Sequence, residues 1–423
     1  MIEIPPWAAG ILLITTLAAI APLRADSLIH PQDVVAVCDD SFAGRTQSSV
    51  DIADYLLMCQ PVPGVRVVQL GMNRETIELF MKRAENDVAP FQPNVVITSL
   101  GTTDAQVSEL TPIALGIHAR YRAQTIDILK KMGARTIVLA STGCYDSSLP
   151  PDSTGDATTW NKNLGILRDA DRQVAATTGV VFADPFQVML NAMPKAKAKY
   201  GDKYSFNIGD GIRQAGSGQL IRAYAYLKAL GCDGGIGTIT VDLATNSAQG
   251  TDGQRILSCV NGSVEIESTR YPFCFSGSPE RADSTSGATA FYPFNDDLNR
   301  YLLVVKGLRG ANAKITWGAE SRTFPTAELA KGVNLADAFA AHTPFDATFA
   351  QVEAAVWRQQ EPQSTYEQFF FHNLADYKVM VADHAASVDQ LAAAIIAQDK
   401  SLAAEAAALV VPVRHTLKIE DLP

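Results

Sequence analysis

The sequence has little charge, and the charge it has is mostly negative. Charged residues make up 19% of its 423 residues, and 35 Lys and Arg stand against 45 Asp and Glu, which gives a formal net charge of −10. A nucleic-acid-binding protein needs a basic face that neutralises phosphates, so this balance argues against a nucleic-acid partner. It also argues against adhesion to an anionic membrane surface.

Long apolar runs are lacking after the N-terminus. The one such run extends from Trp7 to Leu23, and Leu23-Arg24-Ala25 forms a processing site before Asp26. This pattern predicts that residues 1–25 are a signal peptide and that the protein is exported, to the periplasm or the extracellular space. The run begins after Glu3 with no Lys or Arg, so the alternative is an uncleaved anchor of ~17 residues, at the short limit for crossing a bilayer.

Cysteines are few, and none is spaced for a metal. The six cysteines include no Cys-x-x-Cys pair and no zinc-type Cys/His spacing, so we expect neither a metal nor a cofactor. An even count in an exported chain permits disulfides, and six cysteines allow fifteen pairings. Cys259 and Cys274 flank predicted strands and are the preferred pair; the alternative is a set of small buried thiols.

The first half of the chain alternates between apolar β-type runs and helical patterns, which predicts an α/β fold with a parallel sheet covered on both faces. The length of the chain allows a sizeable core and two domains. The expected strands are 34–38, 65–70, 93–100, 136–140 and 179–183, and the expected helices are 46–60, 74–86, 115–132, 160–178 and 218–230.

After Gly235 the pattern changes to short β-type runs separated by Gly, Asn and Asp turns, which predicts a small antiparallel unit. Asn261-Gly262 is expected to be a hairpin turn rather than a glycosylation site. From Thr326 the chain becomes helical, and Pro412 ends the helical pattern at 386–410. This segment is expected to pair with 345–360 as a helical hairpin. The predicted division is therefore 1–25, 26–235, 236–325 and 326–423.

The run Val34–Cys38 is apolar and β-branched, and it ends abruptly in Asp39-Asp40-Ser41. Such a run is typical of a buried parallel strand. In open α/β sheets ligands bind at the carboxyl ends of the strands, so Ser41 is expected where chemistry can occur.

The strand ends resemble the sequence blocks of the SGNH (GDSL) hydrolase superfamily over roughly 30–340. Asp39-Asp40-Ser41 matches block I, Gly101-Thr102-Thr103-Asp104 matches block III, and Asp210-Gly211-Ile212-Arg213 matches block V before the last helix of the domain. Segments 210–243 and 264–340 look like an exported bacterial branch with a C-terminal extension. The resemblance implies a three-layer α/β/α sandwich with a flavodoxin-like sheet, and ester hydrolysis of a small-molecule or carbohydrate ester.

The same resemblance implies Ser41 as nucleophile and Asp210 as the acid of the triad, with Asp40 and Asp104 beside the oxyanion and binding residues Arg74 and Thr103. Three signature residues are replaced. Arg213 stands in the position of the base, and a guanidinium with a pKa above ~12 cannot accept the serine proton. Thr103 replaces the oxyanion asparagine, and Arg74 replaces the block II glycine, where its side chain is expected to enter the space for the substrate oxygen.

These departures favour an ester hydrolase by descent with impaired turnover. The alternative is a non-catalytic protein that binds a glycan or an anion in the former cleft. Arg74 and Arg213 then either neutralise the acidic residues around them (Asp39, Asp40, Glu75, Asp104 and Asp210) or form an anion pocket. His118 is expected to pack between helices rather than to act as a substitute base. Trp160, Trp317 and Trp357 are expected in the core, and the alternative is that they are platforms on which sugars stack.

Overall fold

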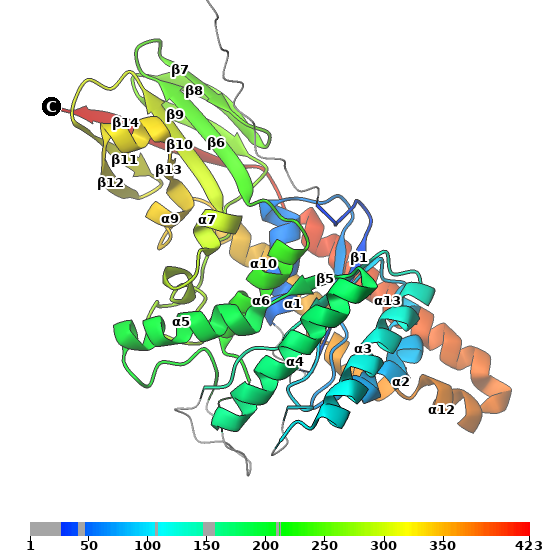
Figure 1. Ribbon diagram of the computed structural model, residues 1–423. Coiled ribbons are helices and arrows are strands. Elements are labelled where there is room, and N and C mark those ends of the chain that lie inside the picture. Colours follow the sequence, from blue (N-terminus) through cyan, green and yellow to red (C-terminus); the bar gives the residue numbers. More distant parts are fainter. Residues whose placement is uncertain (1–26, 41–46, 106–108, 147–156, 209–210, 212) are drawn as a thin grey trace, which may run out of the picture.

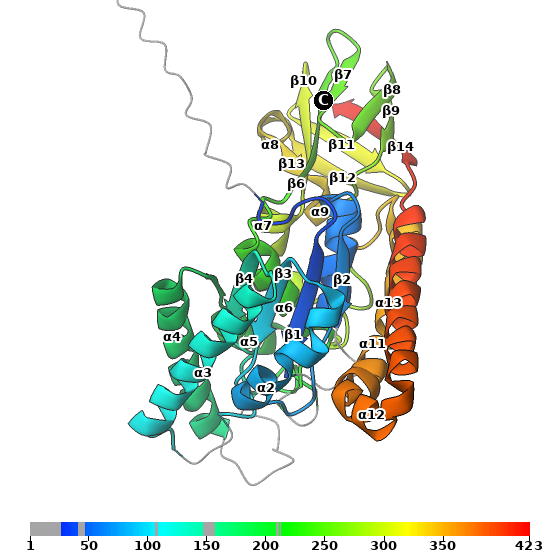
Figure 2. The ribbon, with the colours of Figure 1, turned by 90° about the vertical axis from the view of Figure 1, so that its right-hand side faces the viewer.

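The computed structural model describes residues 27–40, 47–105, 109–146, 157–208, 211 and 213–423. These residues form a parallel α/β body and a β-sandwich that lies at one end of it (Figure 1). Turned by 90°, the view shows the long helix α13 (Ala385–Ala408) running along the side of the α/β body toward the sandwich (Figure 2).

The α/β body is built on a five-stranded sheet with the order β2-β1-β3-β4-β5, and every neighbouring pair is parallel. This order is that of flavodoxin-like doubly wound sheets, whose ligands lie at the carboxyl ends of the strands. The predicted fold class is confirmed. The strands are β1 (Val34–Asp39), β2 (Arg66–Gln69), β3 (Val95–Ser99), β4 (Thr136–Ala140) and β5 (Val181–Ala183).

The side chains of β1 alternate between two hydrophobic cores, because successive residues of a strand point to opposite faces. Val35 and Val37 pack with α1, α5 and α6, whereas Ala36 and Cys38 pack with α2, α3 and the last turns of α4. The helices are α1 (Gln47–Asp54), α2 (Ile77–Asp87), α3 (Pro112–Lys131), α4 (Ala157–Thr178), α5 (Pro185–Tyr200) and α6 (Gly216–Ala229), and a π-helical turn (Tyr55–Cys59) extends α1.

The β-rich region is larger than the small antiparallel unit predicted for it. It has a four-stranded sheet, β13-β10-β6-β7, and a five-stranded sheet, β12-β11-β14-β9-β8, and β6 pairs with β10 in parallel. Its strands are β6 (Gly235–Asp242), β7 (Ser247–Gly250), β8 (Gln254–Val260), β9 (Ser263–Ser268), β10 (Arg300–Lys306), β11 (Asn312–Trp317), β12 (Glu320–Pro325), β13 (Val333–Asn334) and β14 (Val413–Leu422).

Two local features of this region settle sequence-based expectations. Asn261 and Gly262, with φ of 50° and 77°, form the tight turn between β8 and β9, as the hairpin pattern predicted. By contrast, the end of the region predicted to be helical is a strand: β14 lies between β11 and β9, in the middle of its sheet. Trp317 and Trp160 are buried, as expected, whereas Trp357 is half-buried and packs against the edge of the core.

The C-terminal helices protect the edge of the parallel sheet at β2. They are α10 (Asp346–Gln360), α11 (Gln363–Tyr366), α12 (Leu374–Met380) and α13, and the predicted hairpin between the first and last of them is present. Gln359 donates to a β2 carbonyl at 3.0 Å and Gln363 accepts from a β2 amide at 2.5 Å, so two side chains satisfy the open strand. Asp399 of α13 accepts from both amides and pairs with Arg66 of β2.

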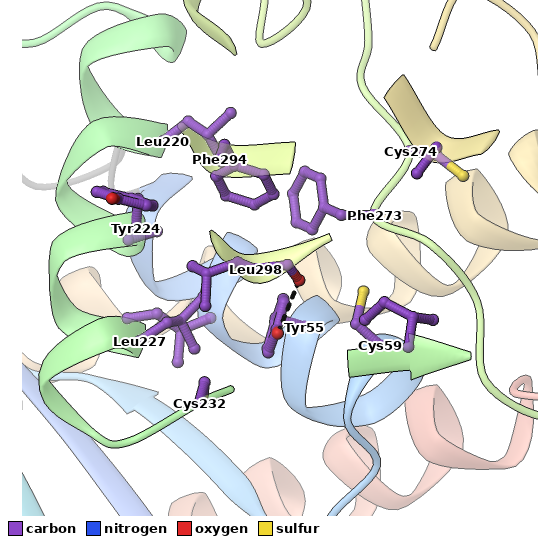
Figure 3. Packing of buried hydrophobic residues seen from close by; sticks show 14 of the residues in the cluster. Tyr55, Cys59, Leu220, Tyr224, Leu227, Cys232, Phe273, Cys274, Phe294 and Leu298 are labelled. Atoms are coloured by element: carbon purple, nitrogen blue, oxygen red, sulfur yellow. Dashed lines mark hydrogen bonds between the residues drawn. The ribbon is translucent and has the colours of Figure 1, made fainter. Parts of the chain in front are cut away.

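The two bodies share one hydrophobic core. Tyr55 donates its hydroxyl to the carbonyl of Leu298 at 2.8 Å, and Phe273 and Phe294 pack edge to face beside it (Figure 3). Two short helices, α7 (Phe294–Leu298) and α9 (Leu335–Ala338), add to this contact, while α8 (Thr326–Lys331) flanks the sandwich. The segment 269–293, which connects β9 to α7, thus belongs to the α/β body as much as to the sandwich.

All six cysteines are free thiols, so the expected pairing of Cys259 with Cys274 is wrong in this structure. Cys274 lies buried by the shared core, whereas Cys259 is a half-buried residue of β8. Among the described residues no single helix is long and apolar enough to cross a membrane, although α12 and the following Ala382–Ala408, bent by 111°, reach that length and composition together.

Candidate functional site

The candidate site lies at the carboxyl ends of β1 and β3. Of the predicted site residues, the structure places Asp40, Arg74, Thr103, Asp104 and Arg213. The predicted nucleophile Ser41 and the predicted acid Asp210 lie outside the described residues, so their roles stay predictions.

Asp40 connects the end of β1 to the loop after β3. One carboxylate oxygen accepts from the amides of Gly101 and Thr102 at 3.0 and 2.7 Å, and the other accepts from the Thr102 hydroxyl at 3.2 Å. Burial raises the pKa of Asp40 to about 7, while the Arg222 charge and the Thr102 amide act in the opposite direction. The sequence blocks I and III are therefore held together by a buried carboxyl group.

A buried arginine that the sequence reading missed neutralises the acidic end of β1. Arg222 of α6 is 1% exposed, lies 3.0 Å from Asp39, and donates to the Ser99 hydroxyl at 3.1 Å. Its neighbour Tyr226 receives a further hydrogen bond at 3.1 Å. The sequence did contain a sign of this buried ion pair, since Arg222 is the one arginine within the mostly apolar helical run at 218–230.

Buried arginines other than the two substituted ones pair with two acids of this region. Arg222 forms an ion pair with Asp39, and Arg83 forms one with Glu75. The guanidinium of Arg83 is buried, and it also donates to the carbonyl that follows β2 at 2.8 Å. Buried cations thus offset the buried acids of the site.

Block II begins with a glycine that has no room for a side chain. A Cβ on Gly71 would lie 2.4 Å from a carboxylate oxygen of Asp39 and 2.5 Å from its main-chain oxygen. Three residues later Arg74 has a φ of 57°, in the left-handed region that glycine favours. The side chain of Arg74 is exposed, and it has no ion pair within the part of the chain that the structure describes.

Block III leads into a buried charged cluster on α3 and α4. Asp104 accepts from the first amide of α2 at 3.3 Å, and burial raises its pKa while the charges of His118 and Arg122 lower it. The Nε2 atom of His118 lies 2.8 Å from Asp171, and Arg122 donates to the same carboxylate at 2.7 and 2.9 Å.

His118 packs between helices, as expected, but it also carries an unused nitrogen. Its Nδ1 atom is buried and has no hydrogen-bond partner among the described residues. The ring is held by Asp171, and its charge lowers the pKa of Asp104 in block III.

Of block V, the structure describes Gly211 and Arg213. The carbonyl of Gly211 accepts from the amide of Asp146, in the loop after β4, at 3.0 Å, and the carbonyl of Arg213 accepts from the amide of Ile208 at 2.7 Å. Arg213 is half-buried. These two residues therefore lie at the edge of the sheet where the strands end, as do the described residues of blocks I and III.

A very small apolar pocket adjoins this edge. Its volume is about 10 Å³, room for about one water molecule. Trp160 and Tyr145 meet edge to face in its wall, with ring centroids 5.2 Å apart. The lining residues are Thr102, Ala105, Gly143, Cys144, Tyr145, Trp160 and Leu164.

The sequence matches no protein-family model and no curated protein. Among solved structures, the chain is similar to a gut microbial diltiazem-metabolizing enzyme, BT4096, with a TM-score of 0.68, 18% identity, and 93% of this chain and 98% of that chain covered. At this identity the likeness shows a shared fold.

Shorter likenesses reach esterases. A catalytic mutant of the acetylxylan esterase Axe2 from Geobacillus stearothermophilus covers 48% of this chain and 96% of its own at 16% identity, with a TM-score of 0.36. A putative GDSL-like lipase from Parabacteroides merdae covers 48% and 97% at 15% identity, with a TM-score of 0.39. Each of these two likenesses extends over about half of the chain.

Proposed function

We propose that this chain is an exported protein with an SGNH-type ester-hydrolase scaffold in which ester turnover is impaired. Its ligand would be a small-molecule or carbohydrate ester bound at the carboxyl ends of β1 and β3. The convergence of blocks I, III and V at this edge, with Asp40 connecting two of them, supports a former ester-hydrolase cleft.

The observation that carries the impairment is Arg213 in the position of the catalytic base. A guanidinium remains protonated at neutral pH and cannot remove the proton of a serine hydroxyl. Loss of one member of a serine-hydrolase triad reduces turnover by ~10⁴–10⁶. Thr103 in place of the oxyanion asparagine adds a loss of ~10²–10³, although such losses do not simply add.

The backbone of Arg74 limits how much of the oxyanion site is lost. Its φ of 57° lies in the left-handed region that glycine adopts readily, and its side chain is exposed. An amide donor at this position therefore remains compatible with the fold. The main defect of the proposed site is in proton transfer, followed by the Thr103 replacement.

A fluorophosphonate probe tests this proposal, because it labels only an activated serine. We expect the wild type to be labelled no faster than Ser41→Ala, with Ser278→Ala, an exposed serine, as the matched control. Rapid labelling that is lost in Ser41→Ala but kept in Ser278→Ala would contradict impairment. Loss of such labelling in His118→Gln would then identify the imidazole with the unused Nδ1 as the base.

Repair of the base gives a second test. Arg213→His is expected to raise hydrolysis of a p-nitrophenyl acetate probe by less than ~10-fold, because Thr103 still occupies the place of the asparagine donor. The double change Arg213→His, Thr103→Asn is expected to exceed either single change. A gain of ~10³-fold or more from Arg213→His alone would show that the oxyanion site is intact.

The alternative function is non-catalytic binding of an anionic glycan. The exposed guanidinium of Arg74, with no ion pair among the described residues, favours it, since guanidinium groups bind carboxylate and sulfate well. Calorimetric titration with a uronic acid or a sulfated glycan should give heat with the wild type and little with Arg74→Ala, Arg213→Ala. Equal heats from the two proteins would refute this alternative.

A further inference from the structure

A second cavity, much larger than the pocket beside Thr102, lies where the segment 269–293 meets α10. Its volume is about 510 Å³, within the range of small-molecule sites. None of its lining residues belongs to the candidate site at β1 and β3. Those that matter below are Cys274, Phe275, Ala350, Phe349 and Glu353.

The wall of this cavity combines apolar surface with polar side chains: Asp346, which accepts from the amide and the hydroxyl of Thr343, the exposed His342, and Glu353. Phe275, Phe349 and Ala350 supply carbon atoms, whereas Glu353 supplies a half-buried carboxylate. Within the described chain Glu353 makes no hydrogen bond and no ion pair. Burial raises the pKa of Glu353.

Two further buried carboxylates lie on α1, which packs against α10, the helix of Glu353. Asp51 and Asp54 are 1% and 0% exposed, and neither forms an ion pair among the described residues. Burial raises the pKa of both well above the ordinary value, and the charge of Glu353 raises it further. The Gln47 amide lowers the pKa of Asp51, but the charges that act on this pair are those of carboxylates alone.

Three neighbouring carboxylates without a counter-charge are costly in a protein interior. An unpaired buried charge costs several kcal/mol, so such a group either takes up a proton or acquires a cation. Among the described residues no group of three or more His, Cys, Asp or Glu side chains is arranged to hold a metal ion. A cation that enters the cavity beside Glu353 would supply the missing charge.

The aromatic wall indicates what kind of cation fits. Phe275 and Phe349 can contact the apolar body of a ligand, and aromatic faces also attract ammonium groups. We propose that this cavity is a binding site for an organic ammonium compound with an apolar body, whose charged nitrogen is held by Glu353. The proposal does not depend on the proposed function of the site at β1 and β3.

Calorimetric titration with benzylammonium tests the site, with benzyl alcohol as the neutral analogue of the same size. We expect saturable binding of benzylammonium to the full-length protein and at least ~10-fold weaker binding of benzyl alcohol, because the hydroxyl can still donate a hydrogen bond to Glu353 but carries no charge to pair with its carboxylate. Glu353→Gln, which keeps the shape of the side chain, should weaken benzylammonium by ~10-fold or more. Glu328→Gln makes the same chemical change on an exposed residue of α8 and should leave binding unchanged.

A steric variant locates the site independently of charge. Ala350 is exposed on α10 and lines the cavity, so Ala350→Trp should fill the space without disturbing the fold and should abolish benzylammonium binding. Absence of saturable binding to the wild type would overturn the proposal. So would equal affinity for benzyl alcohol, or unchanged binding in both Glu353→Gln and Ala350→Trp.

Discussion

The histidine of β14 should make the stability of this protein fall in mild acid. His415 is buried in the sandwich, where the indole N–H of Trp317 donates to its Nδ1 atom at 3.1 Å. The imidazole proton must therefore lie on Nε2, which is 2.9 Å from the Ser268 hydroxyl and 3.1 Å from that of Tyr301. Burial lowers the pKa of His415 to about 4. In addition, a second proton, on Nδ1, would point at the indole N–H of Trp317.

The size and the sign of the effect follow from linkage. The ordinary histidine pKa is ~6.5, so between pH 6.5 and 4 the unfolded chain binds a proton that the folded chain does not. Unfolding is favoured by ~1.4 kcal/mol for each pH unit in this window. We expect His415 to cost the folded state ~2 kcal/mol on going from pH 7.5 to 5, and ~3 kcal/mol by pH 4.

Urea unfolding, followed by tryptophan fluorescence at pH 7.5 and 5.0, measures this contribution as a difference between proteins. His415→Asn does not titrate, and its amide oxygen can still accept from Trp317, so the wild type should lose ~2 kcal/mol more than this variant. His384→Asn, at an exposed histidine, should lose as much as the wild type. Equal losses in the wild type and His415→Asn would refute the reasoning, because the acids that titrate in the same range are common to both.

Two further predictions concern the sheet edge and block II. Asp399→Ala should lower the free energy of unfolding by ~3–5 kcal/mol, because it leaves the buried guanidinium of Arg66 and the amide of Gln363 without their partner. Chemical denaturation measures this loss. A loss below ~1 kcal/mol would contradict the role assigned to the carboxylate. Gly71→Ala should cost ~1–3 kcal/mol or more in the same assay, since the new methyl group would overlap Asp39, and a neutral effect would show that the loop adjusts freely.

The parallel sheet could be predicted from the sequence because its information is local. The strand predicted at 136–140 is β4 (Thr136–Ala140). Both ends of each of the other four strands lie within two residues of the predicted ends. Buried parallel strands are continuous apolar runs bounded by turns, so each one is recognisable without its neighbours. The order of the blocks then placed Asp40 and Thr103 at one edge, where the structure has them.

What the sequence did not reveal depends on contacts between distant segments. Arg222 lies 183 residues from Asp39, and nothing local identifies it as the partner of that carboxylate. The helix predicted at 46–60 was assigned an apolar side, yet Asp51 is buried among other carboxylates. β14 did have a local signal, since its residues alternate between exposed and buried, but the strong helical pattern before it dominated the interpretation.

The position of β14 has a consequence for the order in which the chain can fold. Its residues follow those of β9 and β11 in the chain by about a hundred positions or more, yet they lie between these two strands, at the centre of a sheet. Until Val413–Leu422 has been synthesised and has paired, those two strands have open edges, which are prone to pair with other chains. A chain that ends before Val413 would therefore keep an α/β body joined to an unclosed, aggregation-prone sandwich.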